Sequence, residues 1–95
     1  MEVVWAQPAL NDLADLRDFI QKENPSAASR IAQRIIEVVA LISQHPSIGR
    51  PGRVPDTREM VVAQTPFLIA YSALNDQLVI LRVLHGAREW PVSRD

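Results

Sequence analysis

The chain contains no cysteine, and its two histidines, His45 and His85, lie far apart in the sequence. The missing thiols exclude disulfide bonds and thiolate metal sites, and they favour a cytoplasmic protein. Neither histidine has a cysteine or an obvious carboxylate companion, so the sequence predicts no metal site. No glycine-rich loop follows a strand-like run, and we therefore expect no cofactor.

Two further absences concern membranes and nucleic acids. No apolar run approaches the ~18 residues that a membrane-spanning helix needs, and the first residues lack the basic and apolar regions of a signal peptide. The formal net charge is −1, which gives no excess of positive charge for binding nucleic acid. We expect no membrane association, and no sequence-specific DNA binding by this chain alone.

What the chain has in quantity is aliphatic side chains: 47% of the residues are hydrophobic, but only 5% are aromatic. The 95 residues predict one domain over positions 1–95. A domain of this size has a small core, so some apolar surface is left for another molecule to cover. Lys22 is the only lysine, and the basic residues of the second half are all arginine, which can make planar bidentate contacts.

The first half of the chain has the pattern of a strand followed by two helices. Residues 3–5 form a short β-type run. Apolar residues then recur at helical spacing over 9–20 and again over 28–42. Between these segments, Asn24 is suited to cap the second helix and Pro25 to open it. Two helices with so short a joint should pack as an antiparallel hairpin.

The second half has the pattern of a loop and three strands. Residues 47–56 contain the prolines and glycines of a loop. Strand-like runs follow at 59–63, 67–74 and 78–84. Asn75 and Asp76 predict a tight hairpin between the last two runs, because both residues tolerate positive φ. The element order β-α-α-β-β-β predicts an α+β fold with the helical hairpin packed on a small antiparallel sheet.

The strand expected over 67–74 is apolar on both faces, whereas a half-solvated antiparallel strand should alternate. Phe67, Ile69, Tyr71 and Ala73 share one face, and Leu68, Ala70 and Leu74 share the other. The helical hairpin can cover only one face. We therefore predict a partner protein that covers the second face; the alternative is that loops and termini of the chain cover it.

Cationic and aromatic residues gather at the end of the last expected strand, where they could meet a phosphate, a base or a partner protein. Cleavage of RNA through its own 2′-hydroxyl would need a base, an acid and cations around the phosphorane. Residues of the right types are Glu59, Arg58, Arg82, His85 and Arg88. The alternative is that these residues are ordinary solvated strand ends.

An ordered set of short segments resembles a known family. These are Trp5, Asp12-Leu13, residues 24–28 (NPSAA), 46–50 (PSIGR), 57–59 (TRE), the strand around Tyr71, and 81–90 (LRVLHGAREW). In this order and spacing they resemble the ParE/RelE superfamily of toxins from bacterial type II toxin–antitoxin modules, and the ParE branch more than the RelE branch. The resemblance implies a β-α-α-β-β-β fold and a cognate antitoxin, usually ParD-like, whose C-terminal segment folds onto the toxin.

The branch of the superfamily determines the expected activity. ParE toxins are taken to poison DNA gyrase, whereas RelE toxins cut mRNA on the ribosome. RelE-type nucleases carry an arginine early in the strand that holds Tyr71, where this chain has Phe67 and Leu68, and a tyrosine near the C-terminus, where it has Trp90. We therefore expect a toxin that inhibits DNA gyrase by binding it and is neutralised by a ParD-like antitoxin. The alternative is a RelE-like mRNA endonuclease.

Two sets of contact residues follow from this expectation. For the contact with gyrase we predict residues at or beyond the last strand, namely Arg82, His85, Arg88, Trp90 and Arg94. For the antitoxin we predict the outer face of the helical hairpin and the open sheet surface, with Leu16, Ile20, Ile35 and Val39 as candidates.

Overall fold

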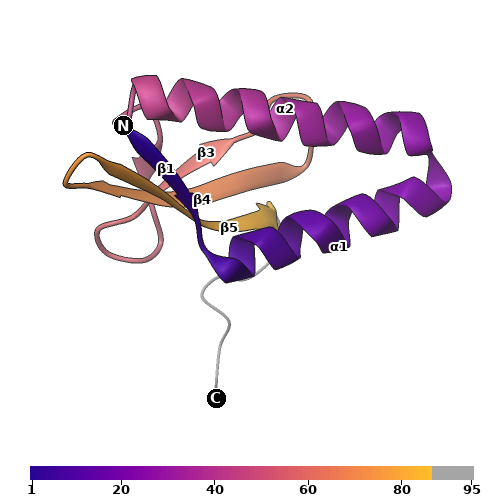
Figure 1. Cartoon of the computed structure of the whole chain (residues 1–95), viewed down its shortest axis with the longest axis horizontal. Coiled ribbons are helices and arrows are strands. Elements are labelled where there is room, and N and C mark those ends of the chain that lie inside the picture. The colour runs from indigo at the N-terminus through magenta and orange to yellow at the C-terminus, as the bar shows by residue number, and fades with distance from the viewer. Residues whose placement is uncertain (87–95) are drawn as a thin grey trace, which may run out of the picture.

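A computed structural model of the chain describes residues 1–86 and contains two helices and five strands (Figure 1). The elements are β1 (Glu2–Trp5), α1 (Gln7–Glu23), α2 (Pro25–Gln44), β2 (Arg50–Pro51), β3 (Arg58–Val61), β4 (Phe67–Leu74) and β5 (Gln77–His85). This order confirms the predicted α+β arrangement of a strand, a helical hairpin and three longer strands. The two-residue strand β2 lies within the segment that we expected to be a loop.

The helical hairpin forms where Asn24 and Pro25 predicted the joint between its helices. The Asn24 side chain accepts a hydrogen bond from the Ala27 N–H at 3.1 Å, which caps α2, and Pro25 supplies the first residue of that helix. α2 ends at Gln44, just before Pro46, because a proline disfavours helical geometry in the residue that precedes it. The two helices meet at Asn24 and spread apart toward their other ends (Figure 1).

The sheet has the strand order β1-β5-β4-β3-β2. β3, β4 and β5 form the predicted antiparallel meander, and Asn75 and Asp76 take φ values of 54° and 62° in the tight turn between β4 and β5. β1, however, pairs parallel to β5, with Trp5 opposite Ile80, so the sheet is mixed rather than antiparallel throughout. A local pattern does not encode this pairing, because its two strands lie at opposite ends of the sequence.

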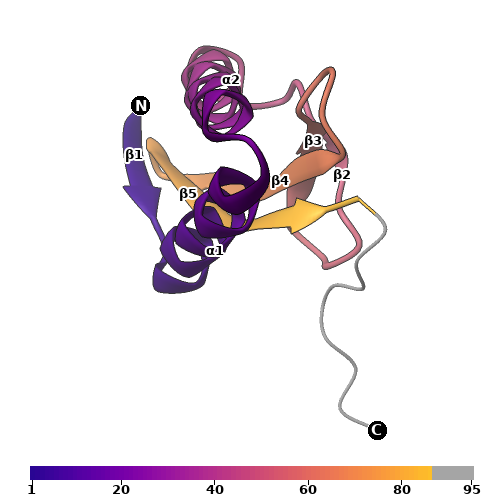
Figure 2. The ribbon, with the colours of Figure 1, turned by 90° about the vertical axis from the view of Figure 1, so that its right-hand side faces the viewer.

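The core lies between the helices and one face of the sheet. Ile35 and Ile42 of α2 are fully buried there with Ile69, Tyr71 and Ile80 of the two central strands. α1 lies against β5, as the view along the helices shows (Figure 2). The apolar stripes of the two helices therefore supply the cover that we expected for this face.

The second face of the sheet is less open than the alternation predicted. Leu68 and Ala70 are buried although they stand outside the main core cluster, whereas Leu74 and Val61 are 73% and 53% exposed. The expectation of a wholly uncovered second face is therefore corrected. Apolar side chains remain uncovered at the ends of the strands but not in the middle of β4.

Two properties of the described part of the chain bear on function. Neither α1 nor α2 is long and apolar enough to cross a lipid bilayer. Within residues 1–86, no group of three or more histidine, cysteine or carboxylate side chains is placed to hold a metal ion.

Candidate functional site

Arg82 lies in the second half of β5, and its guanidinium is bound by a carboxylate of α1. Asp12 accepts hydrogen bonds from Arg82 Nε at 2.7 Å and from Nη2 at 2.9 Å, and its Oδ2 also accepts from the Val83 N–H at 3.0 Å. Only 19% of the Arg82 side chain and 10% of the Asp12 side chain are exposed. The hydrogen bond to Asp12 raises the pKa of Arg82, against the effect of burial. Arg82 therefore joins α1 to the sheet and is not presented to solvent.

Glu59 is the one buried charged residue of the described chain, at 3% exposure. Its Oε1 accepts a hydrogen bond from Arg50 Nη2 at 3.3 Å, and its Oε2 accepts one from the Arg53 N–H at 3.0 Å and also lies 3.3 Å from Arg53 Nε. Glu59 thereby fixes the loop between β2 and β3 against the sheet.

The protonation of Glu59 follows from these contacts. Burial alone would raise the pKa of its carboxyl group, but the Arg53 backbone hydrogen bond, the Arg50 hydrogen bond and the two positive charges together lower it below its ordinary value. Glu59 is consequently a carboxylate at neutral pH. Its oxygens already accept bonds from the neighbouring loop, so it is a structural anchor in this arrangement.

Arg58 lies beside Glu59 in sequence but serves another network. Its Nη1 donates to the Gly49 carbonyl at 2.7 Å and to the Ser47 carbonyl at 3.4 Å. The Tyr71 hydroxyl accepts from the Gly49 N–H and donates to the Pro46 carbonyl. A Cβ at Gly49 would come within 2.7 Å of that hydroxyl, so only glycine fits there. These bonds fix the chain that leaves α2.

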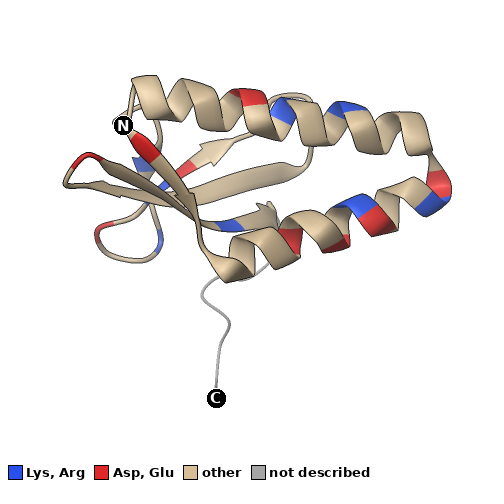
Figure 3. Cartoon of the chain, in the orientation of Figure 1, with Lys and Arg blue, Asp and Glu red and all other residues tan. Residues whose placement is uncertain are grey.

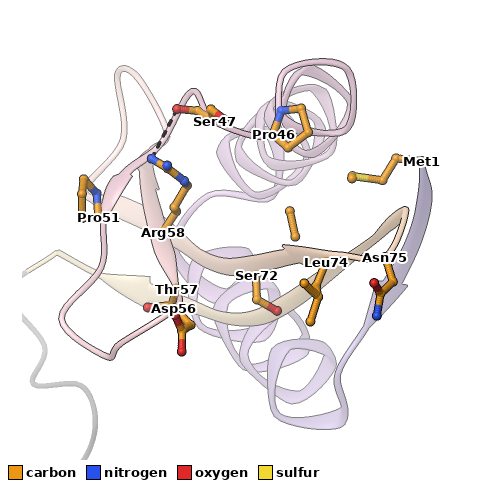
Figure 4. Close-up of a pocket in the computed structure, with 11 residues that line it drawn as sticks. Met1, Pro46, Ser47, Pro51, Asp56, Thr57, Arg58, Ser72, Leu74 and Asn75 are labelled. Atoms are coloured by element: carbon orange, nitrogen blue, oxygen red, sulfur yellow. Dashed lines mark hydrogen bonds between the residues drawn. The ribbon is translucent and has the colours of Figure 1, made fainter.

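A hollow lies next to this network (Figure 4). It has a volume of about 570 Å³, and its lining includes Met1, Pro46, Arg58, Ser72 and Leu74. Arg58 is the one cationic side chain among its lining residues, and it points toward the Ser47 carbonyl that it bonds. One guanidinium that is already hydrogen-bonded does not make a phosphate site.

His85 ends β5 beside Phe67 of β4, and the two rings meet edge to face with their centroids 5.8 Å apart. His85 and Phe67 line a smaller groove that runs along α1. The remaining predicted contact residues, Arg88, Trp90 and Arg94, lie outside the described residues.

The candidate nuclease residues do not come together in residues 1–86. β4 separates the strand that carries Arg58 and Glu59 from the strand that carries Arg82 and His85, a backbone separation of roughly 10 Å at ordinary strand spacing. Glu59 pairs with Ala70 and His85 with Phe67, so they are also offset along the strands. Each charged candidate bonds a different part of the chain. The fifth candidate, Arg88, lies outside the described residues.

The candidate antitoxin residues all pack against the core, and two of them, Leu16 and Ile20, also line a groove beside α1. Ile35 is fully buried, Val39 and Leu16 are 5% and 8% exposed, and Ile20 packs against the same core. The interpretation of these positions as an outer face is thereby corrected. Helical periodicity finds the apolar side of a helix, but in this chain that side faces the sheet.

The sequence reasoning missed a groove between α1 and the adjoining ends of β4 and β5. Its volume is about 230 Å³, and it is lined by Asp12, Asp15, Leu16, Phe19, Ile20, Phe67, Val83 and His85. The available signal was Phe19, an aromatic residue outside the strict apolar stripe of the first helix, which is 71% exposed. A large exposed aromatic side chain on a helix is a reason to look for a partner.

A family model matches nearly the whole sequence of the chain. The model described as "ParE toxin of type II toxin-antitoxin system, parDE" matches residues 3–90. Toxin Y4kP of Sinorhizobium fredii is 39% identical over 87 residues, which are 92% of this chain and 90% of that protein. Toxin RelE2 of Caulobacter vibrioides is 36% identical over 87 residues, which are 92% of this chain and 97% of that protein.

A solved structure gives the same result at the level of the fold. A chain from the chromosomal ParDE toxin–antitoxin system of P. aeruginosa superimposes with a TM-score of 0.82 at 27% sequence identity. The match covers 90% of this chain and 95% of that one. The mixed sheet with its helical hairpin is thus the fold of a known toxin–antitoxin component.

Proposed function

Since the chain belongs to the ParE family of toxins from type II toxin–antitoxin systems, we propose that it inhibits DNA gyrase by binding it and that a ParD-like antitoxin neutralises it. The observation that carries the proposal is the separation of Glu59, Arg58, Arg82 and His85. Acid–base cleavage needs its base, acid and cations around one phosphate. Here the charged groups stabilise three different parts of the fold.

The antitoxin part of the proposal is supported by the named neighbours. The structural match comes from a ParDE system, whose name joins a toxin to an antitoxin. The chain also exposes large apolar side chains of the helical hairpin such as Phe19, Ile36 and Leu41. A protein partner that covered some of them would gain apolar burial on binding.

The gyrase part of the proposal is tested by a supercoiling assay with purified gyrase and the purified chain. We expect the chain to inhibit supercoiling. His85→Gln should weaken inhibition about tenfold, as the loss of one central interface side chain does. His45→Gln is the matched control, because His45 caps the end of α2 and is not a predicted contact residue.

A second function is favoured by one observation, the 36% identity to the toxin named RelE2. This second function is the cleavage of mRNA on the ribosome. If supercoiling is unaffected while ribosome-bound mRNA is cut, the gyrase proposal is wrong and this second function holds. If expression of the chain without an antitoxin leaves growth unchanged, neither toxic activity is present.

A further inference from the structure

We propose that the groove between α1 and the ends of β4 and β5 receives an antitoxin segment that combines an apolar side chain with a lysine or arginine. This inference rests on the proposed function, because it specifies how the antitoxin binds. The first support is the floor of the groove, where Phe19, Ile20, Phe67 and Val83 line one hollow. Phe19 is 71% exposed, so an apolar side chain that entered here would remove aromatic surface from water.

The second support is the charge beside the floor. α1 carries an excess of acidic residues, with Asp12, Asp15, Asp18 and Glu23 against Arg17 and Lys22, whereas α2 carries Arg30 and Arg34 against Glu37 (Figure 3). Asp12 is bound to Arg82, but Asp15 and Asp18 have no hydrogen-bond or ion-pair partner within residues 1–86. Of these two, Asp15 lines the groove beside its apolar floor. Exposed carboxylates in such a place are complementary to a segment with positive charge and apolar residues. They would repel the phosphates of a nucleic acid, which excludes that class of ligand for this groove.

The position of the groove suggests how binding would neutralise the toxin. His85, one of the two candidate target residues within residues 1–86, lines the same groove as Phe19 and Asp15. A segment seated on Phe19 and Phe67 would cover the His85 ring, which already contacts Phe67 edge to face. The antitoxin and the toxin's target would then compete for one surface, so the toxin could not bind both.

Photo-cross-linking tests which occupant the groove takes. We would place p-benzoylphenylalanine at position 19 of the full chain, mix it with the proposed ParD-like antitoxin, and map the products by mass spectrometry. The control places the same group at position 74, because Leu74 is 73% exposed and lies away from the groove. Attachment to the antitoxin from position 19 but not from position 74 supports the proposal. Attachment to a second copy of this chain, or to its own residues 87–95, overturns it.

Affinity measurements by calorimetry test the chemistry of the groove. We expect Phe19→Ser to weaken antitoxin binding by about 30-fold or more, and Leu74→Ser to have little effect. Asp15→Asn should weaken binding about fivefold at low salt and less at high salt, whereas Asp76→Asn at the exposed hairpin turn should not. If the unaltered chain forms no complex, the proposed antitoxin partner is wrong. If the complex forms and Phe19→Ser binds with full affinity, only the groove is wrong.

Discussion

Asp12 and Glu59 make nearly the same set of bonds in two regions of the molecule. Each accepts from an arginine guanidinium and from one backbone N–H. They differ in the cations: the Arg82 side chain is 19% exposed, whereas Arg50 and Arg53 beside Glu59 are 62% and 35% exposed. If the carboxylate is lost, Arg50 can turn to water but Arg82 cannot. The stability that each carboxylate contributes should therefore depend mainly on what it leaves behind.

The largest expected effect comes from Asp12→Ala. It removes the partner of a mostly buried guanidinium and of the Val83 N–H, and breaking such a pair costs about 3–5 kcal/mol. Urea denaturation would measure the loss in the free energy of unfolding. Asp15→Ala is the matched control, because Asp15 is an exposed aspartate one turn further along α1. Equal losses in the two variants would contradict the comparison.

A smaller effect is expected from Glu59→Gln, about 1–2 kcal/mol, because glutamine keeps the shape and can still accept one hydrogen bond. The pKa of Glu59 is lower in the folded chain than its ordinary value of 4.5. Its stabilising contribution is therefore complete above that value and is lost as the pH falls through the lowered folded pKa. Unfolding measured across acidic pH should show the difference between wild type and variant shrinking below about pH 4.5. A difference that stayed constant well below that value would show that the charge of Glu59 does not stabilise the fold.

The smallest effect is expected from Arg50→Ala. An ion pair with so exposed a guanidinium contributes about 0.5 kcal/mol or less, and salt should reduce this further. Arg82→Ala should cost several times more, because it leaves Asp12 buried and without its partner. Chemical denaturation at two salt concentrations would compare the two variants. Equal costs for both arginines would mean that exposure does not decide the contribution.

The sequence predicted those parts of the fold that local chemistry determines. Asn24 and Pro25 identified the joint of the helical hairpin, and Asn75 and Asp76 identified the β4–β5 turn. Each of these signals acts within a few residues, through a cap hydrogen bond or a tolerated positive φ. Such features need no knowledge of what packs against them.

The remaining features depend on pairs that are distant in sequence. The bond between Asp12 and Arg82 joins residues 70 positions apart, and before the fold is known both are ordinary polar residues. Periodicity likewise marked Ile35 and Val39 as apolar, but it could not decide between a core and a partner. The candidate site was predicted least well, because α1 and β5 create its groove only when they come together.

The parallel pairing of β1 with β5 has a consequence for biosynthesis. The ribosome makes β1 before both helices, but β5, its neighbour in the sheet, is made only after the helices and the other strands. Until β5 is made, β1 has no strand with which to pair and α1 has no strand to pack against. The nascent polypeptide therefore cannot fold progressively from its first elements. The sheet can therefore close only after β5 has been made, and a partner protein present at that moment would meet the chain while it folds.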